Sequence, residues 1–179
     1  MQLYYSPTTC ATAVHIVLIE LGIHHTPLKV PLKDDTHPIT VKFREISPMA
    51  HFPVLLLDDG TVLTQMIAVL MYLADLVPEK RLFPPASDLN QRARATRWLS
   101  FLAADVHTRL ATEWPWTTLL DDDAIKRKAR SFWEQRLGRR LAVLNEQLER
   151  EEWILGEYTV ADPYLFVILG WAEPTSFSL

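Results

Sequence analysis

The most reactive side chain in this sequence is that of its single cysteine, Cys10. It follows the loop Ser6-Pro7-Thr8-Thr9, whose threonine can cap a helix that we predict from Cys10 to about Leu21. Unpaired N–H groups and the helix dipole at a helix start stabilise a thiolate, so this position favours a lowered thiol pKa. The alternative interpretation is a cysteine that packs as a small buried hydrophobic residue.

Histidines supply the next candidate groups. His107 lies in a long predicted helix, and a neutral imidazole there could donate a hydrogen bond to a thiol or accept its proton near neutral pH. An exposed helix histidine without a chemical role is the alternative. For His15, inside the first predicted helix, we expect a structural hydrogen bond.

The stretch from residue 52 to residue 66 predicts a hairpin that leads into a helix. Val54 to Leu57 is a short apolar run, Asp59-Gly60 is a turn pair, and Thr61 to Leu63 supplies the second strand. Gln65 and Met66 then open a helix, and carboxylates are favoured at helix starts.

Pro53 heads the first strand of that hairpin. Only an X-Pro bond is cis at modest cost, and a cis bond after Phe52 would turn the backbone of that residue outward. An extended peptide could then pair with this backbone. A trans proline that starts a strand is the ordinary alternative.

These groups need two kinds of scaffold to position them. Up to residue 77, the pattern predicts a βαβ unit followed by a ββα unit, the order that a thioredoxin-like sheet needs. A proline-rich boundary follows, and everything after it has helical periodicity. The predicted helices there run from Leu89, after an Asp88 cap, to Arg109; from Asp123 to about Glu149; and from Pro163 to Trp171, after a capping box of Thr159 and Asp162.

Taken together, the strand-heading proline, the hairpin and the Gln65-Met66 helix start resemble a glutathione transferase. The pattern YYSPxxC, followed by Ala13, His15, Ile16 and Leu18, is similar to the bacterial beta class. The resemblance covers nearly the whole chain. It implies an α/β thioredoxin-like N-terminal domain (βαβαββα) at residues 1–77, a linker at 78–86 and an all-α helical domain at 87–179.

The resemblance also implies catalytic roles. The cysteine that matches Cys10 contacts the glutathione sulfur in beta-class relatives and can form a mixed disulfide with it. Tyr5 matches a tyrosine that lines the site without being the main activator of the thiol. His107 matches a histidine that reaches across the domain cleft toward glutathione.

Further residues match positions that bind the rest of glutathione, as co-substrate. Val54 matches the residue after the cis-proline whose backbone pairs with the cysteinyl portion. Gln65 and Met66 match the pair that receives the γ-glutamyl carboxylate. Met66 departs from the usual Ser or Gly, so we expect weakened affinity through its backbone N–H alone. Lys33 is the candidate for the glycyl carboxylate, in a loop that aligns poorly.

A typical relative continues for some two dozen or more residues beyond the helix that closes on Trp171, so this helical domain reads as truncated. We therefore expect a less complete electrophile pocket and a stability that depends more on dimerisation. The resemblance implies a homodimer formed through the helix after Gln65 and the long helix after Asp88.

Composition excludes several classes of protein. A net charge of −4 without a dense basic stripe argues against nucleic acid as a partner. No apolar run approaches the roughly 18 residues of a membrane span, and no signal peptide precedes the first strand. A single cysteine excludes an internal disulfide and suits the cytoplasm. The histidines show no metal-ligand spacing, so we expect no metal.

The leading interpretation is a glutathione transferase that conjugates the glutathione thiol to small hydrophobic electrophiles, with low activity if Met66 and the short end impair the site. Thiol–disulfide exchange through Cys10 is a second form of chemistry, limited to a mixed disulfide with glutathione. The alternative from another class is a non-catalytic protein that keeps this fold for binding or as a scaffold.

Overall fold

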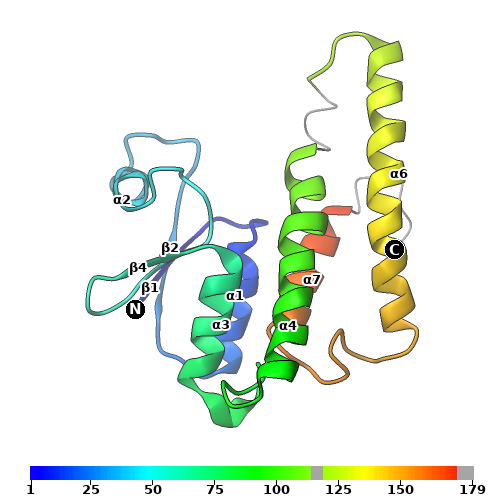
Figure 1. The fold of residues 1–179 in the computed structure, drawn as a ribbon. Coiled ribbons are helices and arrows are strands. Elements are labelled where there is room, and N and C mark those ends of the chain that lie inside the picture. The colour runs from blue at the N-terminus through cyan, green and yellow to red at the C-terminus, as the bar shows by residue number, and fades with distance from the viewer. Residues whose placement is uncertain (114–118, 173–179) are drawn as a thin grey trace. The chain divides into compact units, whose positions relative to one another are not determined.

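The computed structural model describes residues 1–113 and 119–172. Its contacts divide the chain into two compact units, residues 1–92 and 93–179, and each is described by itself below. The first is an α/β unit and the second is helical (Figure 1). Both parts of the predicted fold class are therefore confirmed.

The first unit follows the order βαβαββα, the thioredoxin-like order predicted from the sequence. Its sheet has the strand order β2-β1-β3-β4, in which β1 runs parallel to β2 and antiparallel to β3. The elements are β1 (Gln2–Tyr5), α1 (Ala11–Glu20), β2 (Thr26–Lys29), α2 (Pro38–Ile46), β3 (Val54–Leu56), β4 (Val62–Thr64), α3 (Met66–Leu76) and a 3₁₀ turn, η1 (Pro78–Lys80).

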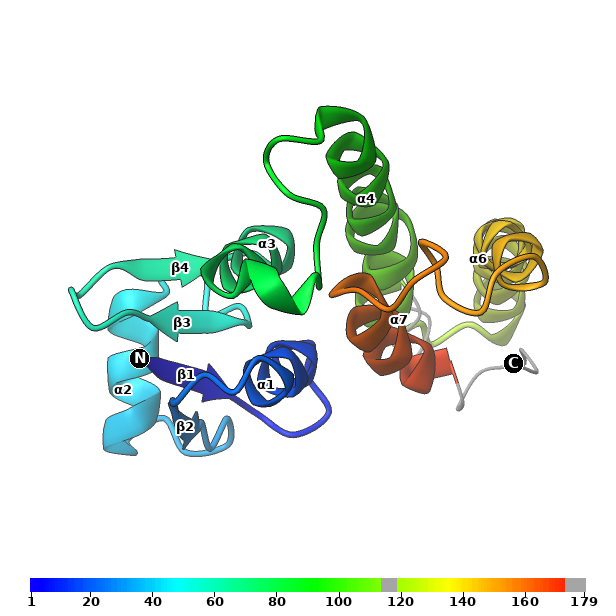
Figure 2. The ribbon, with the colours of Figure 1, turned by 90° about the horizontal axis from the view of Figure 1, so that it is seen from below.

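Helices cover both faces of this sheet. Figure 2 shows α1 and α3 packed side by side on one face and α2 on the other. On the α2 side, the core contains Tyr4, Val30, Phe43 and Val54, all of which are buried. The predicted apolar stripe of α1 faces the interior, since Val14, Val17, Leu18 and Leu21 are buried.

The start of α1 differs from the prediction in its cap. The residue at the N-cap is Cys10, and no side chain caps the helix there. The Thr9 hydroxyl donates instead to the carbonyl oxygen of Ser6, 2.7 Å away, because that acceptor lies within reach inside the preceding turn. At the other end, Gly22 adopts a φ of 69° and stops the helix as predicted.

The boundary between the two units falls within the first turn of a helix, α4 (Leu89–Phe101), most of which belongs to the second unit. The elements of that unit are α4, the π-helical segments η2 (Leu102–His107) and η3 (Arg109–Glu113), α6 (Asp123–Leu148), α7 (Ala161–Leu169) and a 3₁₀ turn, η4 (Gly170–Ala172). The Asp88 carboxylate accepts from the Gln91 N–H at 3.0 Å, which confirms the predicted cap. The predicted α-helix up to Arg109 becomes π-helical after Phe101.

A buried capping box holds the start of α7. Asp162 accepts the backbone N–H of Thr159 at 2.8 Å through one carboxylate oxygen and the N–H of Ile154 at 3.0 Å through the other. The Thr159 hydroxyl accepts from the Ala161 N–H at 3.3 Å. The predicted reciprocal box is thus present, although the helix boundary lies one residue later, at Val160.

Within the described residues, no helix combines the length and the apolar character needed to cross a membrane. The expectation for the end of the chain concerns residues 173–179, which lie outside the described residues.

Candidate functional site

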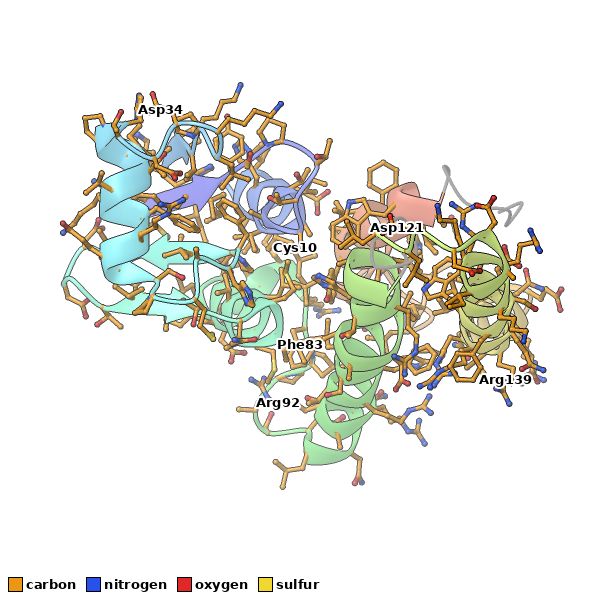
Figure 3. The ribbon with its side chains drawn as sticks, turned by 90° about the horizontal axis from the view of Figure 1, so that it is seen from above. Cys10, Asp34, Phe83, Arg92, Asp121 and Arg139 are labelled. Atoms are coloured by element: carbon orange, nitrogen blue, oxygen red, sulfur yellow. The ribbon has the colours of Figure 1, made fainter. Side chains whose placement is uncertain are left out.

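Cys10 lies at the start of α1, as predicted (Figure 3). Its side chain is buried. Its Sγ donates to the carbonyl oxygen of Phe52 at 3.2 Å. Burial raises the pKa of the Cys10 thiol to about 11, against the smaller lowering effect of backbone hydrogen bonds from Cys10 and Ala11. The prediction of a lowered thiol pKa is therefore wrong, because desolvation of the thiolate outweighs the helix start.

Phe52 comes before a cis peptide bond to Pro53. Its ring is stacked on that of Phe43 with centroids 4.7 Å apart, and its carbonyl oxygen accepts the Cys10 thiol. The contact joins two segments that are 42 residues apart in the sequence. In the sequence, Phe52 stood out only because it precedes a proline. The resemblance assigned the pairing with glutathione to Val54, the residue after that proline.

Val54 is the first residue of β3 and directly follows the cis-linked Pro53. It lies opposite Tyr4 of β1 on one side and Thr64 of β4 on the other. Its side chain is fully buried, so only its backbone could face a ligand. The pairing of the Val54 backbone with the cysteinyl portion of glutathione stays a prediction.

Gln65 and Met66 stand at the start of α3, as predicted. Gln65 adopts a φ of 70° and a ψ of 120°, a conformation that costs a non-glycine residue energy and that often marks a functional site. Its carbonyl accepts from the Val69 N–H, so the N–H groups of the first turn of α3 have no partner inside the helix. Met66 is 6% exposed, so little of its extra bulk meets solvent.

Tyr5 is half-buried at the end of β1, and its ring contacts that of His15 with centroids 5.7 Å apart. The His15 ring meets the His25 ring edge-on at 5.0 Å. Among the described residues, the His15 side chain makes these ring contacts and no hydrogen bond, so the expected structural hydrogen bond of that side chain is wrong. Its pKa is lowered by burial and by the neighbouring His25.

Lys33 is exposed in the loop between β2 and α2. A side chain of this length can adopt many conformations there, so its assignment to a glycyl carboxylate stays a prediction.

His107, in the second unit, is half-buried in the π-helical segment η2. Its Nδ1 lies 2.7 Å from the hydroxyl oxygen of Tyr164 in α7, and its ring meets that of Trp171 edge-on with centroids 5.0 Å apart. Burial lowers the pKa of His107, which favours the neutral imidazole at pH 7. The alternative of an exposed histidine is therefore wrong. Tyr164 was missed because only the fold brings residues 57 positions apart together.

Within residues 1–113 and 119–172, no group of three or more His, Cys, Asp or Glu side chains is placed to hold a metal ion. The chemistry open to the described residues is hydrogen bonding and proton transfer at a thiol, together with anion binding at a helix start.

Comparison with known proteins assigns this arrangement to a family. Residues 8–76 match the family described as glutathione S-transferase, N-terminal domain. The chain is 34% identical to glutathione S-transferase GstA of Escherichia coli O157:H7 over 180 residues, an alignment that covers 100% of this chain and 86% of that protein.

Solved structures agree. A bacterial beta-class glutathione S-transferase of Sphingomonas chungbukensis has a TM-score of 0.83 at 31% identity, over 99% of this chain and 85% of that one. A sphingomonad glutathione S-transferase complexed with glutathione has a TM-score of 0.84 at 29% identity, with the same coverage of both chains. The chain belongs to the glutathione S-transferase family of enzymes and resembles its beta class.

Proposed function

We propose that this protein binds glutathione in its first unit, stabilises the thiolate of that glutathione and lets its sulfur attack small hydrophobic electrophiles. The sulfur forms a bond to an electrophilic carbon, and the electrons of the bond that breaks leave with the departing group or move onto the activated acceptor. The observation that carries the proposal is the 3.2 Å contact of the Cys10 thiol with the Phe52 carbonyl. A related transferase, the sphingomonad enzyme, was solved with glutathione.

That contact supports a binding mode for glutathione. It brings the start of α1 next to the residue before Pro53. In our proposal, the backbone of Val54, which follows Pro53, pairs with the cysteinyl residue of glutathione. The sulfur then comes close to the start of α1, where N–H groups and the helix dipole favour an anion. Tyr5, at the end of the neighbouring strand β1, lines the same region.

The γ-glutamyl end requires an anion site, and the start of α3 suits it. The first-turn N–H groups of α3 have no partner within the helix, and the backbone of Gln65 is held at a positive φ just before them. We propose that Met66 contributes its N–H and that the Gln65 amide hydrogen-bonds the same group. Lys33 remains our candidate for the glycyl carboxylate.

Because its pKa is raised, we propose that Cys10 acts as a neutral thiol and not as the expected thiolate. With a pKa of about 11, only about one Cys10 thiol in 10⁴ is ionised at pH 7. A neutral thiol donates a hydrogen bond, so we propose that Cys10 turns from the Phe52 carbonyl toward the glutathione thiolate when glutathione binds. Exchange through a Cys10 thiolate is the less favoured second reaction, because its nucleophile is scarce in the free protein.

His107 is our candidate in the second unit for a group that acts on the glutathione sulfur. Its support is a half-buried imidazole that is neutral at pH 7. A neutral imidazole offers one donor and one acceptor nitrogen, so it can serve a thiol in either capacity.

Calorimetric titration with glutathione tests the proposal. We expect a dissociation constant between micromolar and low millimolar for the wild-type chain. Gln65→Gly should weaken binding about tenfold, because it removes the side-chain amide yet keeps a residue that tolerates the positive φ. Gln135→Ala, an exposed glutamine in α6, is the matched control and should bind as the wild type does.

The outcomes separate the readings. Absence of binding heat from folded protein would overturn the enzyme proposal and favour a protein that uses this fold for other binding. Binding with equal affinity in Gln65→Gly would move the γ-glutamyl site away from the start of α3.

A Cys10→Ser variant distinguishes the two reactions. Conjugation of glutathione to a chloronitroaromatic electrophile should persist, since a serine hydroxyl also donates a hydrogen bond. Formation of a mixed disulfide with oxidised glutathione must disappear, because it needs the Cys10 sulfur. Loss of conjugation together with mixed-disulfide formation would make Cys10 the nucleophile and reverse our preference.

A further inference from the structure

We propose that Tyr164 is a positioning residue that donates its hydroxyl proton to Nδ1 of His107 and so holds the imidazole as the tautomer with hydrogen on Nε2. This inference rests on the proposed role of His107 in the reaction. It goes further, because it selects one of the two capacities left open for that histidine: a hydrogen-bond donor to the glutathione thiolate and not the base that removes its proton.

The geometry around His107 fixes its ring on two sides. Nδ1 lies 2.7 Å from the Tyr164 hydroxyl oxygen, and the rings of the two residues meet at a centroid distance of 5.8 Å. Trp171 meets the His107 ring edge-on at 5.0 Å. Tyr164 itself is fully buried in α7. A buried tyrosine has few conformations, so its hydroxyl stays at Nδ1.

The direction of the hydrogen bond follows from the two groups. A phenol O–H is a stronger donor than an imidazole N–H, and a bare imidazole nitrogen is a stronger acceptor than a phenol oxygen. A separation of 2.7 Å is also typical of bonds in which an O–H donates, since N–H donors centre on about 2.9–3.0 Å. Tyr164 is therefore the donor, and the hydrogen of the imidazole lies on Nε2.

A donor at Nε2 has a chemical consequence. Within the described residues, no group hydrogen-bonds Nε2, and we propose that this N–H donates to the glutathione thiolate. Burial lowers the pKa of His107 and so disfavours a positive charge on the ring, which a base would acquire. An N–H donor stabilises a thiolate without taking its proton, which then leaves to solvent when glutathione binds.

Magnetic resonance of histidine ¹⁵N in the full chain, free of glutathione, tests the positioning role. His107 is assigned from the signals that a His107→Gln variant loses. We expect the Nε2–H tautomer in the wild type and a mixture of both tautomers in Tyr164→Phe. Tyr158→Phe, whose ring contacts Trp153 instead, is the matched control and should keep the wild-type signals. An Nδ1–H tautomer in the wild type, or an unchanged tautomer in Tyr164→Phe, would overturn the proposal.

Kinetics test the donor role. His107→Gln keeps an N–H donor of similar reach but has no basic nitrogen, whereas His107→Ala has neither. For the chloronitroaromatic conjugation, we expect kcat/KM to fall less than about threefold in His107→Gln and about 10²-fold in His107→Ala. Equal, large losses in both variants would identify a base and overturn the donor role. Equal activity in all three proteins would remove His107 from the reaction, and with it the proposed function of that residue, while the tautomer result stands separately.

Discussion

The first unit holds its candidate functional residues mainly through the main chain, and the second unit holds its own through buried side chains. In the first, Gln65 is defined by a φ of 70°, and the Cys10 thiol bonds to a backbone carbonyl. In the second, His107 is oriented by the Tyr164 hydroxyl, and α7 starts at the buried carboxylate of Asp162.

The two units should therefore be sensitive to different kinds of substitution. A site formed by backbone groups tolerates a changed side chain if the new residue can adopt the same φ and ψ. A network of buried side chains fails when one member is removed, because the remaining partners stay buried without hydrogen bonds. Substitutions in the first unit should therefore affect binding more than folding, and those in the second should affect folding more.

The largest expected effect is that of Asp162→Ala in the second unit. It leaves the N–H groups of Ile154 and Thr159 buried without an acceptor, so we expect the free energy of unfolding to fall by about 3–5 kcal/mol. Chemical denaturation measures this. Asp122→Ala removes an exposed cap that accepts from Ala124 and Ile125, where water can replace the carboxylate, and should cost only about 1 kcal/mol. Equal losses of unfolding free energy in the two variants would contradict the special cost of removing a buried partner.

Cys10→Ser should change how stability depends on pH. The folded thiol has a pKa of about 11, against an ordinary value of 9.0, so the folded state holds this proton more tightly. The resulting stability is present below pH 9 and is lost as the pH rises toward 11, by about 3 kcal/mol. Serine does not titrate in this range. Urea unfolding between pH 7 and pH 10.5 should show a steeper decline for the wild type, and parallel curves would contradict the burial of the thiol.

Two variants of Gln65, Gln65→Ala and Gln65→Gly, separate the side-chain amide from the backbone conformation. Both variants lack the amide, but alanine, like the native glutamine, pays about 1 kcal/mol for the positive φ, and glycine does not. We expect both to weaken glutathione binding about tenfold, and we expect Gln65→Gly to be about 1 kcal/mol more stable than Gln65→Ala. Titration and thermal unfolding of the two variants check this. If the two variants were equally stable, the backbone at residue 65 would carry no strain.

The smallest effect concerns a side-chain cluster in the first unit. Arg92 bonds both carboxylate oxygens of Asp75, at 2.6 and 3.0 Å, and lies 4.9 Å above the Phe83 ring (Figure 3). Arg92→Lys loses the bidentate geometry, and since Asp75 is half-exposed we expect a loss of about 1 kcal/mol. Glutathione affinity should stay the same in a parallel titration. A weaker affinity would mean that the binding region of the first unit also depends on side-chain networks.

Much of the candidate site could be predicted from local patterns. The hairpin at Asp59-Gly60, the helix starts at Cys10 and Gln65, and the box of Thr159 and Asp162 depend on neighbours within a few residues. The pKa of Cys10 could not be predicted in this way, because it depends on burial by residues distant in sequence. The place of Val54 in an inner strand likewise depends on the pairing of β3 with both β1 and β4.

The sequence by itself determined the order of the elements, the cis-capable junction at Pro53 and the identity of the groups that could act on a thiol, since these follow from residue types and short spacings. The direction of the pKa shifts of Cys10 and His107 and the partner of the imidazole depend on the tertiary structure. Desolvation and a hydrogen bond between α7 and η2 arise when distant segments pack, and no local pattern records which segments will meet.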